Sequence, residues 1–409
     1  MIMRRQPDDV ISILSKRGVV RSVRDIKASA PIRFVRSYGN DTMYLFQKGI
    51  EGSQMQGIIT STDERLPLII GECDKAYFTS ELPPNLEEWL MEMDEEITAY
   101  LQSDAPIDLT EDAAENDRVS ISPIIKSRWS QGAPFNNALF IDGKYRQVGC
   151  NAIAIGQLLR HFGVEGINGV TYKRGCKKTP VYTTRTLGLK IDSLPAKAIF
   201  DYSRMPQKAP TAADSKNAVS TFLAYISKSI TSDFKDTATA ASPTYASQVL
   251  KTYFKMGETE LVGCNQVGAT AFEDRIYNEL INGYPVIING YNDKTGHCFL
   301  VDGYDADSDR FHFNLGWGGT CDGYYRLSAL NPKKNNVTLD YNARKTIVVV
   351  HPMYQWGDAN QDGNVDILDV TKIAADALNG NNRAESDINN DGKVNVTDAT
   401  LLSNRIIGK

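Results

Sequence analysis

The sequence predicts an α+β protein in three consecutive parts, and three features of the chain indicate this. A cysteine, Cys150, stands where a loop gives way to a helical apolar pattern, and a histidine, His297, opens a pair of predicted strands far downstream. An acidic stretch over residues 103–118 separates an N-terminal unit from the rest of the chain. Two oxygen-rich loops of one pattern begin at Asp358 and Asp387.

The first part, residues 1–102, has the pattern of an independent α+β unit. Its last predicted helix carries apolar residues at helical spacing from Leu86 to Ile97, and the glycine and asparagine of residues 39–41 predict a hairpin turn. The expected elements are helices over residues 8–17 and 86–101 and strands over residues 32–37, 43–47, 56–60, 66–71 and 76–78.

Cys150 is the candidate nucleophile of the second part. A thiol at a helix N-terminus lies at the positive end of the helix dipole, which favours the thiolate. The thiolate is the form that attacks carbonyl carbons, so the position predicts nucleophilic chemistry.

Histidine is scarce, so a partner base can be sought by elimination among His161, His297, His312 and His351. His161 follows Cys150 by eleven residues on the same predicted helix, roughly 16 Å along the axis, which is too far for proton transfer. His351 stands where the second part ends. His297 and His312 flank one predicted hairpin, and the 147 residues from Cys150 to His297 fit the separation of papain-like cysteine and histidine pairs.

Three further residues complete this candidate site. Asn314, at the end of the second predicted strand, can accept the other imidazole N–H and orient the ring, and Trp317 can shield that bond from water. Upstream, the side-chain amide of Gln131 can join the Cys150 backbone N–H as an oxyanion donor.

These blocks together resemble the streptopain family of papain-like cysteine peptidases. The resemblance implies a papain-like α+β peptidase domain over residues 119–353, acting on proteins or peptides. It implies Cys150 as nucleophile, His297 as general base and then acid, and Gln131 as oxyanion donor, with Asn314 or Trp317 orienting and shielding the imidazole. Streptopain has tryptophan directly after the matching asparagine, where this chain has Leu315, so the third partner stays open. The matching blocks are residues 129–136, 148–150 with Ala152 and Ala154, 296–297 and 313–319.

The residues before this region resemble the family's propeptide. Residues 103–118 are acidic and rich in small side chains, a composition that buries little surface and is typical of a linker. A folded unit, an exposed linker and a cysteine peptidase together predict a zymogen that is activated by cleavage within 103–118. The alternative is that residues 1–102 are a permanent accessory domain.

The middle of the second part predicts helices and one buried strand. Residues 237–243 form a loop that either borders the substrate cleft or is a solvated surface loop. The expected helices cover residues 195–202, 218–229, 245–253 and 273–282, and the strand covers residues 285–290.

The third part carries two loops with the ligand spacing of an EF-hand. Oxygen side chains recur at positions 1, 3, 5, 9 and 12, a glycine stands at position 6, and position 7 offers its backbone carbonyl. Each loop is followed by a helical run, over residues 370–378 and 399–407. The candidate calcium ligands are Asp358, Asn360, Asp362, Asn364, Asp366 and Asp369 in the first loop and Asp387, Asn389, Asp391, Lys393, Asn395 and Asp398 in the second.

The duplicated loop and helix resemble a type I dockerin over residues 357–409. That resemblance implies a small helical module with two Ca²⁺ ions and a cohesin-type protein partner. The alternative is a tail stabilised by calcium that has no partner.

Charge and composition limit the remaining possibilities. The chain has a formal net charge of −5, and residues 357–409 hold nine acidic and five basic residues, so the rest is near neutral and does not predict a nucleic-acid binder. Clustered carboxylates repel one another without a cation, and the low calcium level of the cytosol favours a secreted or cell-surface location. The N-terminus lacks the apolar region of a signal peptide in this version of the chain, and no apolar run reaches the length of a membrane span.

The six cysteines do not predict a disulfide scaffold. Cys298 follows His297 on a predicted strand, so we expect it on the opposite face, in the core. The sequence does not pair the other cysteines, Cys73, Cys176, Cys264 and Cys321.

The sequence therefore predicts a secreted cysteine endopeptidase made as a zymogen and carrying a calcium-dependent docking module. Two alternatives stay open. One is an inert scaffold or adhesion protein that acts through the dockerin-like module, and the other is a papain-like amidase that acts on a non-protein amide.

Overall fold

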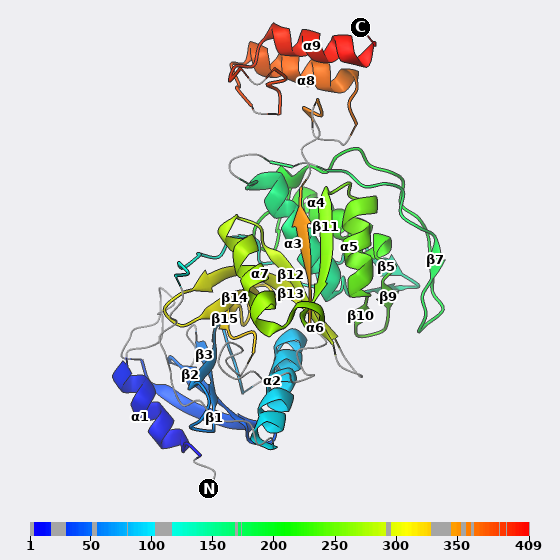
Figure 1. Ribbon diagram of the computed structural model, residues 1–409. Helices are drawn as coiled ribbons and strands as arrows, with labels where there is room; N and C mark the ends of the chain where they lie inside the picture. The colour runs from blue at the N-terminus through cyan, green and yellow to red at the C-terminus, as the bar shows by residue number, and fades with distance from the viewer. Residues whose placement is uncertain are drawn as a thin grey trace. The chain divides into compact units, whose positions relative to one another are not determined.

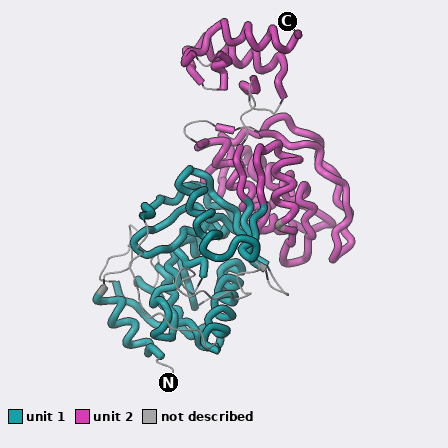
Figure 2. The backbone as a smooth tube through the Cα atoms, in the orientation of Figure 1, with its two compact units in different colours: residues 1–130, 261–348 teal, residues 131–260, 349–409 magenta. Residues whose placement is uncertain are grey.

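The computed structural model describes residues 4–17, 30–50, 55–79, 81–102, 117–167, 171–172, 174–291, 296–328, 345–352, 357–360, 364–383, 385–389 and 391–408. The chain divides into two compact units (Figure 2), residues 1–130 with 261–348 and residues 131–260 with 349–409. Most of the predicted linker, residues 103–116, lies outside the described residues.

The main sheet contains ten strands among the described residues, in the order β1-β2-β3-β4-β15-β14-β13-β12-β16-β11 (Figure 1). The strand pairs with a described register are antiparallel. The strands are β1 Ile32–Tyr38, β2 Met43–Lys48, β3 Gln56–Ser61, β4 Ile69–Asp74, β11 Glu258–Gly263, β12 Val286–Tyr291, β13 Gly296–Asp305, β14 Arg310–Asn314, β15 Gly323–Tyr325 and β16 Thr346–His351.

The N-terminal strands continue directly into the strands of the predicted peptidase domain. β4 pairs with β15, and Gly71 lies opposite Tyr325. A Cβ atom on Gly71 would come within 2.5 Å of the Tyr325 ring, so the glycine leaves room for that ring against the sheet. The first unit therefore combines two segments that are far apart in the sequence, residues 1–130 and 261–348.

Three longer helices belong to the first unit. α1, Pro7–Arg17, begins with proline and two aspartates, which suit a helix N-terminus. Its Val10 and Leu14 pack with Phe46 and Ile58 in one buried cluster. The other two are α2, Pro84–Gln102, and α7, Ala269–Ile281, which follows the single turn α6, Cys264–Val267.

The second unit centres on α3, Cys150–Val164, whose residues from Asn151 to Gly163 are buried. An aromatic cluster fills the core beside it: Phe200 contacts Phe222 with ring centroids 4.9 Å apart, and Tyr202 contacts Phe222 at 5.3 Å. The other elements before residue 261 are β5 Phe140–Ile141, β6 Lys144–Tyr145, β7 Tyr182–Thr183, β8 Lys190–Ile191, η1 Tyr202–Arg204, α4 Ala213–Ser229, β9 Asp233–Phe234, β10 Thr239–Ala240 and α5 Pro243–Thr252.

The C-terminal module consists of two helices, α8 Ile367–Leu378 and α9 Val396–Ile406, each preceded by a predicted calcium loop. Both helices begin with a capping box, in which Asp366 and Asn395 accept backbone N–H groups of the first turn. Ile373 and Leu402 lie at the centre of the small apolar core.

Two predicted elements are wrong, and both errors have the same cause. Residues 76–78 form no strand, because Phe78 turns inward against Gly57, where a Cβ atom would lie 2.4 Å from the ring. Residues 195–202 form no α-helix: the chain is irregular up to the 3-10 helix η1, which begins at Tyr202, and Phe200 and Tyr202 are both buried in the core. In both segments, apolar side chains are buried in the core, although the backbone forms neither a strand nor an α-helix.

The remaining predicted elements are present with shifted ends. The strand expected over residues 66–71 is β4, which begins three residues later because Asp63 and Arg65 form a turn through a side-chain hydrogen bond of 2.7 Å. No helix in the described residues is long and apolar enough to cross a membrane.

Candidate active site and calcium loops

Cys150 is the first residue of α3 and is half-buried, whereas the next thirteen residues are buried. Gly149 precedes it with φ 92° and ψ 143°, a conformation that glycine adopts readily. The side chain of Asn151 lies beside the thiol, with its Nδ2 atom 3.9 Å from the sulfur. The turn thus places the thiol at the helix N-terminus, as the sequence predicts.

Residues 239–241 lie in the segment that the sequence left open as either a cleft border or a surface loop, and they pack against this turn. The hydroxyl of Thr239, on β10, donates to the carbonyl of Gln147 at 2.7 Å. A Cβ atom on Gly149 would lie 3.0 Å from the Thr239 methyl group. Asn151 donates to the Ala241 carbonyl at 3.4 Å. Residues 239–241 therefore hold the Cys150 turn from one side, and no local signal in the sequence distinguishes them from an ordinary loop.

Gln131 lies close to the same turn through its backbone. Its carbonyl accepts the N–H of Val148 at 3.0 Å, and only 9 % of the residue is exposed. Ser227, on α4, donates to the Val148 carbonyl at 3.0 Å from the core side. Gln131 and Cys150 are thus connected through Val148 within one compact unit.

His297 is the second residue of β13, where its backbone pairs with Gly290 of β12. Its side chain lies outside what the structure describes. The next residue, Cys298, is 1 % exposed, so the prediction that it belongs to the core is confirmed.

Asn314 ends β14, and both ends of its side-chain amide are engaged. Its Nδ2 donates to the Ser127 carbonyl at 3.0 Å, and its Oδ1 accepts the N–H of Gly316 at 3.2 Å. Leu315 is buried, and its N–H donates to Asp322 at 2.9 Å. Burial raises the pKa of the Asp322 carboxyl, and the nearby Arg128 partly opposes that rise.

Trp317 follows in a glycine-rich turn. Gly316 and Gly318, on either side of it, have φ angles of 73° and 67°. The Gly318 N–H donates to the Trp129 carbonyl at 2.9 Å. The Trp317 ring nitrogen is buried and has no hydrogen-bond partner within the described part of the chain.

His312, the other histidine of the hairpin, is part of a buried pair. Its Nδ1 lies 2.6 Å from Asp302 Oδ1, and the second Asp302 oxygen accepts the N–H of Ile125 at 2.9 Å. His312 is 4 % exposed and Asp302 is fully buried. This arrangement gives His312 a structural role and leaves His297 as the candidate base.

The predicted catalytic residues fall in both compact units. Cys150 and Gln131 belong to residues 131–260 with 349–409, and His297, Asn314 and Trp317 belong to residues 1–130 with 261–348. The pairing of Cys150 with His297 therefore stays a prediction.

The second predicted calcium loop is curved by its own side chains. Asp387 accepts the N–H groups of Asp391 and Gly392 at 3.1 and 2.8 Å, and Asp391 accepts the N–H of Lys393 at 2.9 Å. Asp398, at position 12, is fully buried and accepts the N–H groups of Ile388 and Asn395, both at 2.9 Å. Carboxylate, amide and carbonyl oxygens are the donors that Ca²⁺ prefers, so the donor chemistry fits.

In the first loop, Asp369 accepts the N–H groups of Asn360 and Asp366 at 3.0 and 2.8 Å. The predicted ligand Asp362 lies outside the described residues. Across the described chain, no three acidic, histidine or cysteine side chains gather closely enough to hold a metal ion by themselves. Each predicted ligand set also includes amide and backbone carbonyl oxygens.

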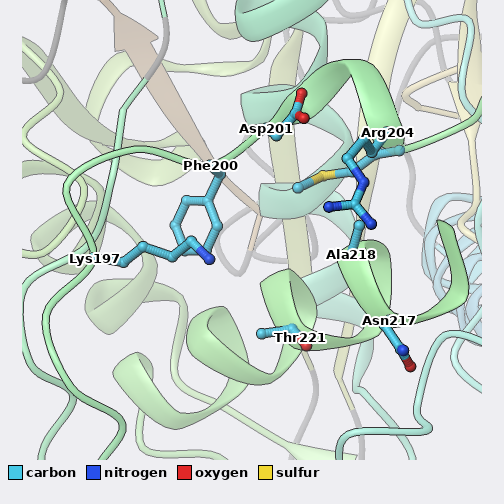
Figure 3. Close-up of a pocket in the computed structure, with 8 residues that line it drawn as sticks. Lys197, Phe200, Asp201, Arg204, Asn217, Ala218 and Thr221 are labelled. Atoms are coloured by element: carbon cyan, nitrogen blue, oxygen red, sulfur yellow. The ribbon is translucent and has the colours of Figure 1, made fainter. Parts of the chain in front are cut away.

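A separate pocket of about 210 Å³ lies beside η1 and α4 (Figure 3). Lys197, Phe200 and Arg204 line it, together with Asn217 and Thr221. The Lys197 ammonium lies 5.4 Å from the Phe200 ring centre. None of the lining residues is a predicted site residue.

A half-buried thiol at the start of a buried helix and two oxygen-rich loops that each precede a helix are features expected of a papain-like cysteine peptidase domain joined to a small module with two predicted calcium loops. Residues 129–325 match the Peptidase C10 family, and residues 356–407 match the Dockerin type I domain. The chain carries a streptopain-like Peptidase C10 domain followed by a type I dockerin domain, so the predicted family and fold class are confirmed. The prediction of a cysteine peptidase is confirmed with them.

The chain is also similar to individual proteases of known sequence or structure. The chain is 28 % identical to the thiol protease/hemagglutinin PrtT of Porphyromonas gingivalis, over 75 % of this chain but only 36 % of that protein. It is 23 % identical to streptopain of Streptococcus pyogenes, over 80 % of this chain and 84 % of streptopain. The structure of a Prevotella intermedia prointerpain A fragment has the same fold, with a TM-score of 0.63 at 22 % identity, covering 78 % of this chain and 98 % of the fragment.

Replacing Gly149 should impair the site without unfolding the protein. In Gly149→Ala, the positive φ and the 3.0 Å approach to Thr239 force the turn before Cys150 to shift, and we expect activity on casein to fall by at least about tenfold. Adding Thr239→Ser removes the methyl group and should recover part of the loss. Equal activity of Gly149→Ala and the parent protein would show that the turn does not position the thiol.

Proposed function

We propose that the chain is an endopeptidase that hydrolyses peptide bonds of proteins through the thiol of Cys150. The observation that carries this proposal is the half-buried Cys150 at the start of the buried helix α3, within a Peptidase C10 domain. The other five cysteines are buried, so Cys150 is the most accessible thiol of the chain.

In the proposed reaction, His297 takes the proton of Cys150 and the thiolate attacks the peptide carbonyl carbon. The carbonyl oxygen becomes an oxyanion, which the Gln131 side-chain amide and the Cys150 N–H stabilise; one such donor contributes about 2.7–4 kcal/mol. His297 then protonates the leaving amine as the C–N bond breaks. Water, deprotonated by His297, hydrolyses the thioester and restores the thiol.

Asn314 is the better supported of the two candidates for orienting His297. Its Nδ2 is anchored on the Ser127 carbonyl, which fixes the amide and keeps Oδ1 as the acceptor. Oδ1 accepts one N–H from Gly316 and has a second lone pair that can accept an imidazole N–H. Trp317 is assigned the shielding role.

The two other functional classes make different predictions. An inert scaffold that acts through its dockerin domain would have a Cys150 thiol of ordinary reactivity. A papain-like amidase would react at Cys150 but would not clear casein. The rate of Cys150 alkylation and the hydrolysis of casein together therefore distinguish the endopeptidase, the inert scaffold and the amidase.

Iodoacetamide at pH 7 should label Cys150 selectively in the processed protein. Burial raises the pKa of both Cys176 and Cys264 to about 11, so these thiols stay protonated and serve as internal controls. Peptide mass spectrometry locates the label, and Cys150→Ala should abolish casein hydrolysis while the circular dichroism spectrum stays unchanged. Casein hydrolysis by Cys150→Ala would contradict the proposal.

We also infer that residues 1–102 act as a propeptide that restrains the hairpin carrying His297. Asn85, on α2, is 3 % exposed, and its Nδ2 donates to the carbonyls of Cys298 and Leu315 at 3.1 and 2.9 Å. These carbonyls belong to the residues directly after His297 and Asn314. Asn85 is thus bonded to the backbone of the residue that follows each of these two candidate residues.

Two further contacts support the same restraint. Trp89 packs edge-on against Tyr325 with ring centroids 4.9 Å apart. Glu72 of β4 and Arg310 of β14 form a buried ion pair at 2.6 Å. Burial raises the pKa of the Glu72 carboxyl, and the nearby Arg310 opposes that rise. Removal of residues 1–102 would leave the edge of β15 and the Arg310 charge without these partners.

Asn85→Ala should accelerate self-processing of the full chain. The substitution removes one donor from each of two carbonyls beside the candidate residues, so we expect the processing half-time to shorten by roughly tenfold on gel time courses. Glu87→Ala, on the exposed side of the same helix, is the matched control and should process at the parent rate. Unchanged or slower processing of Asn85→Ala would contradict a restraining role.

For the third part, we propose that the dockerin domain binds two Ca²⁺ ions and docks onto a cohesin-type protein. The second loop supports this through its side-chain oxygens, which are already drawn inward by backbone N–H groups. Bound calcium would offset the repulsion among the clustered carboxylates. A calcium-dependent module of this kind favours a secreted or cell-surface location.

Asp387→Asn should remove one calcium site and leave the other. The variant lacks the charge at position 1 of the second loop, so calorimetric titration of the full chain should show one ion bound where the parent binds two. Asp214→Asn, an exposed position outside both loops, should bind two ions. Equal calcium stoichiometry in Asp387→Asn and the parent would show that this loop is not a site.

A further inference from the structure

The two calcium loops of the dockerin domain have the same sequence pattern but different surroundings. In the second loop, Asp387 at position 1 is partly exposed and accepts the backbone N–H groups of Asp391 and Gly392. Within the described residues, no basic side chain contacts Asp387. In the first loop, Asp358 at the equivalent position is 1 % exposed.

Asp358 is held by a cation from the peptidase part of the same compact unit. Arg174 Nη1 donates to Asp358 Oδ2 at 2.6 Å, and the side chains are 2 % and 1 % exposed. The backbone of Arg174 is fixed in turn, since the hydroxyl of the buried Tyr202 donates to its carbonyl at 3.1 Å. The backbone of Arg174 is therefore anchored to the peptidase core.

A second cation reaches the same loop at another position. The Lys255 ammonium, in the turn after α5, donates to Asn364 Oδ1 at 3.4 Å. Asn364 is position 7, whose carbonyl is a predicted calcium ligand. Arg174 and Lys255 lie far apart in the sequence, so two separate segments of the peptidase part converge on one calcium loop.

We propose that Ca²⁺ and the peptidase domain compete for the first loop of the dockerin domain. Without calcium, Arg174 and Lys255 hold the loop through Asp358 and Asn364. Calcium binding at Asp358 draws its carboxylate away from Arg174 and releases the module from the peptidase surface. The second loop binds calcium without this competition. The inference rests on the proposed calcium binding of the dockerin domain.

The competition follows from charge, because Ca²⁺ and the Arg174 guanidinium would both bind the Asp358 carboxylate. Ca²⁺ needs the Asp358 carboxylate, and a guanidinium on the same carboxylate places two cations within a few ångströms of each other. Because coupling between two binding events is reciprocal, calcium must weaken the Arg174 contact by the factor by which that contact weakens calcium binding. Typical couplings change affinity by about 5–150-fold.

The test is a calorimetric Ca²⁺ titration of the full chain, with Cys150→Ala as background to prevent self-cleavage. Adding Arg174→Gln should tighten the first site about tenfold and leave the second unchanged, and Asp387→Asn in the same background identifies which site is which. Arg204→Gln, an exposed arginine of the same unit, is the matched control and should change neither site. Lys255→Gln should tighten the first site by a smaller factor and serves if the buried Arg174 variant folds poorly.

A second readout follows the release itself. In small-angle X-ray scattering, calcium should increase the radius of gyration of the parent, whereas Arg174→Gln should already have the larger value without calcium. Two binding sites with affinities unchanged by Arg174→Gln and Lys255→Gln would overturn the competition while leaving the proposed calcium binding intact. Absence of calcium binding at both loops would overturn both.

Discussion

The backbone ladder between β4 and β15 is the interaction on which the first unit depends. Through it, the strands of residues 1–102 and those of the hairpin bearing His297 and Asn314 form one continuous sheet. A sheet edge left unpaired exposes a row of N–H and C=O groups, so the propeptide strands complete a sheet that would otherwise end at β15. The buried Glu72–Arg310 pair and the Asn85 bonds lie beside this ladder and depend on it for their geometry.

The second unit follows a different constraint, the burial of α3. A helix that is buried over thirteen consecutive residues has little freedom to shift, so its first residue is fixed as well. Cys150 occupies that first position, where the helix leaves the core and the thiol becomes accessible. Thr239 of β10 and Ser227 of α4 each donate a hydrogen bond to the preceding turn, which makes the position of the thiol a property of the core packing.

The dockerin domain differs from both because its core is small and its loops are rich in charge. Its two helices are closely alike, with the same capping box at each start. The surroundings distinguish the two loops: the peptidase part supplies two cations to the first and none, among the described residues, to the second. The two loops therefore have similar sequences but unequal electrostatic environments.

The sequence alone determined the features that rest on local patterns. The sequence predicted that Cys150 begins a helix and that each of the two oxygen-rich loops precedes a helix, because each feature depends on residues close together in the chain. The choice of His297 among four histidines is a prediction that depends on a short count. The helices that include Leu86, Ala218 and Val370 were predictable for the same reason, since an apolar stripe at helical spacing must be buried on one side. That reasoning fails for residues 195–202 and 76–78, because apolar side chains there are buried although the backbone does not form the predicted helix or strand.

Only the tertiary structure decided which distant segments meet. Asn85 bonds to a residue 213 positions away, and Arg174 to one 184 positions away. Thr239 reaches the Cys150 turn across 92 residues to Gln147. Such contacts depend on how the sheet and the helices pack, and a threonine, an asparagine or an arginine has no local signature for its partner. Local sequence therefore determined where the candidate residues stand, and packing over long chain distances determined which segments contact them.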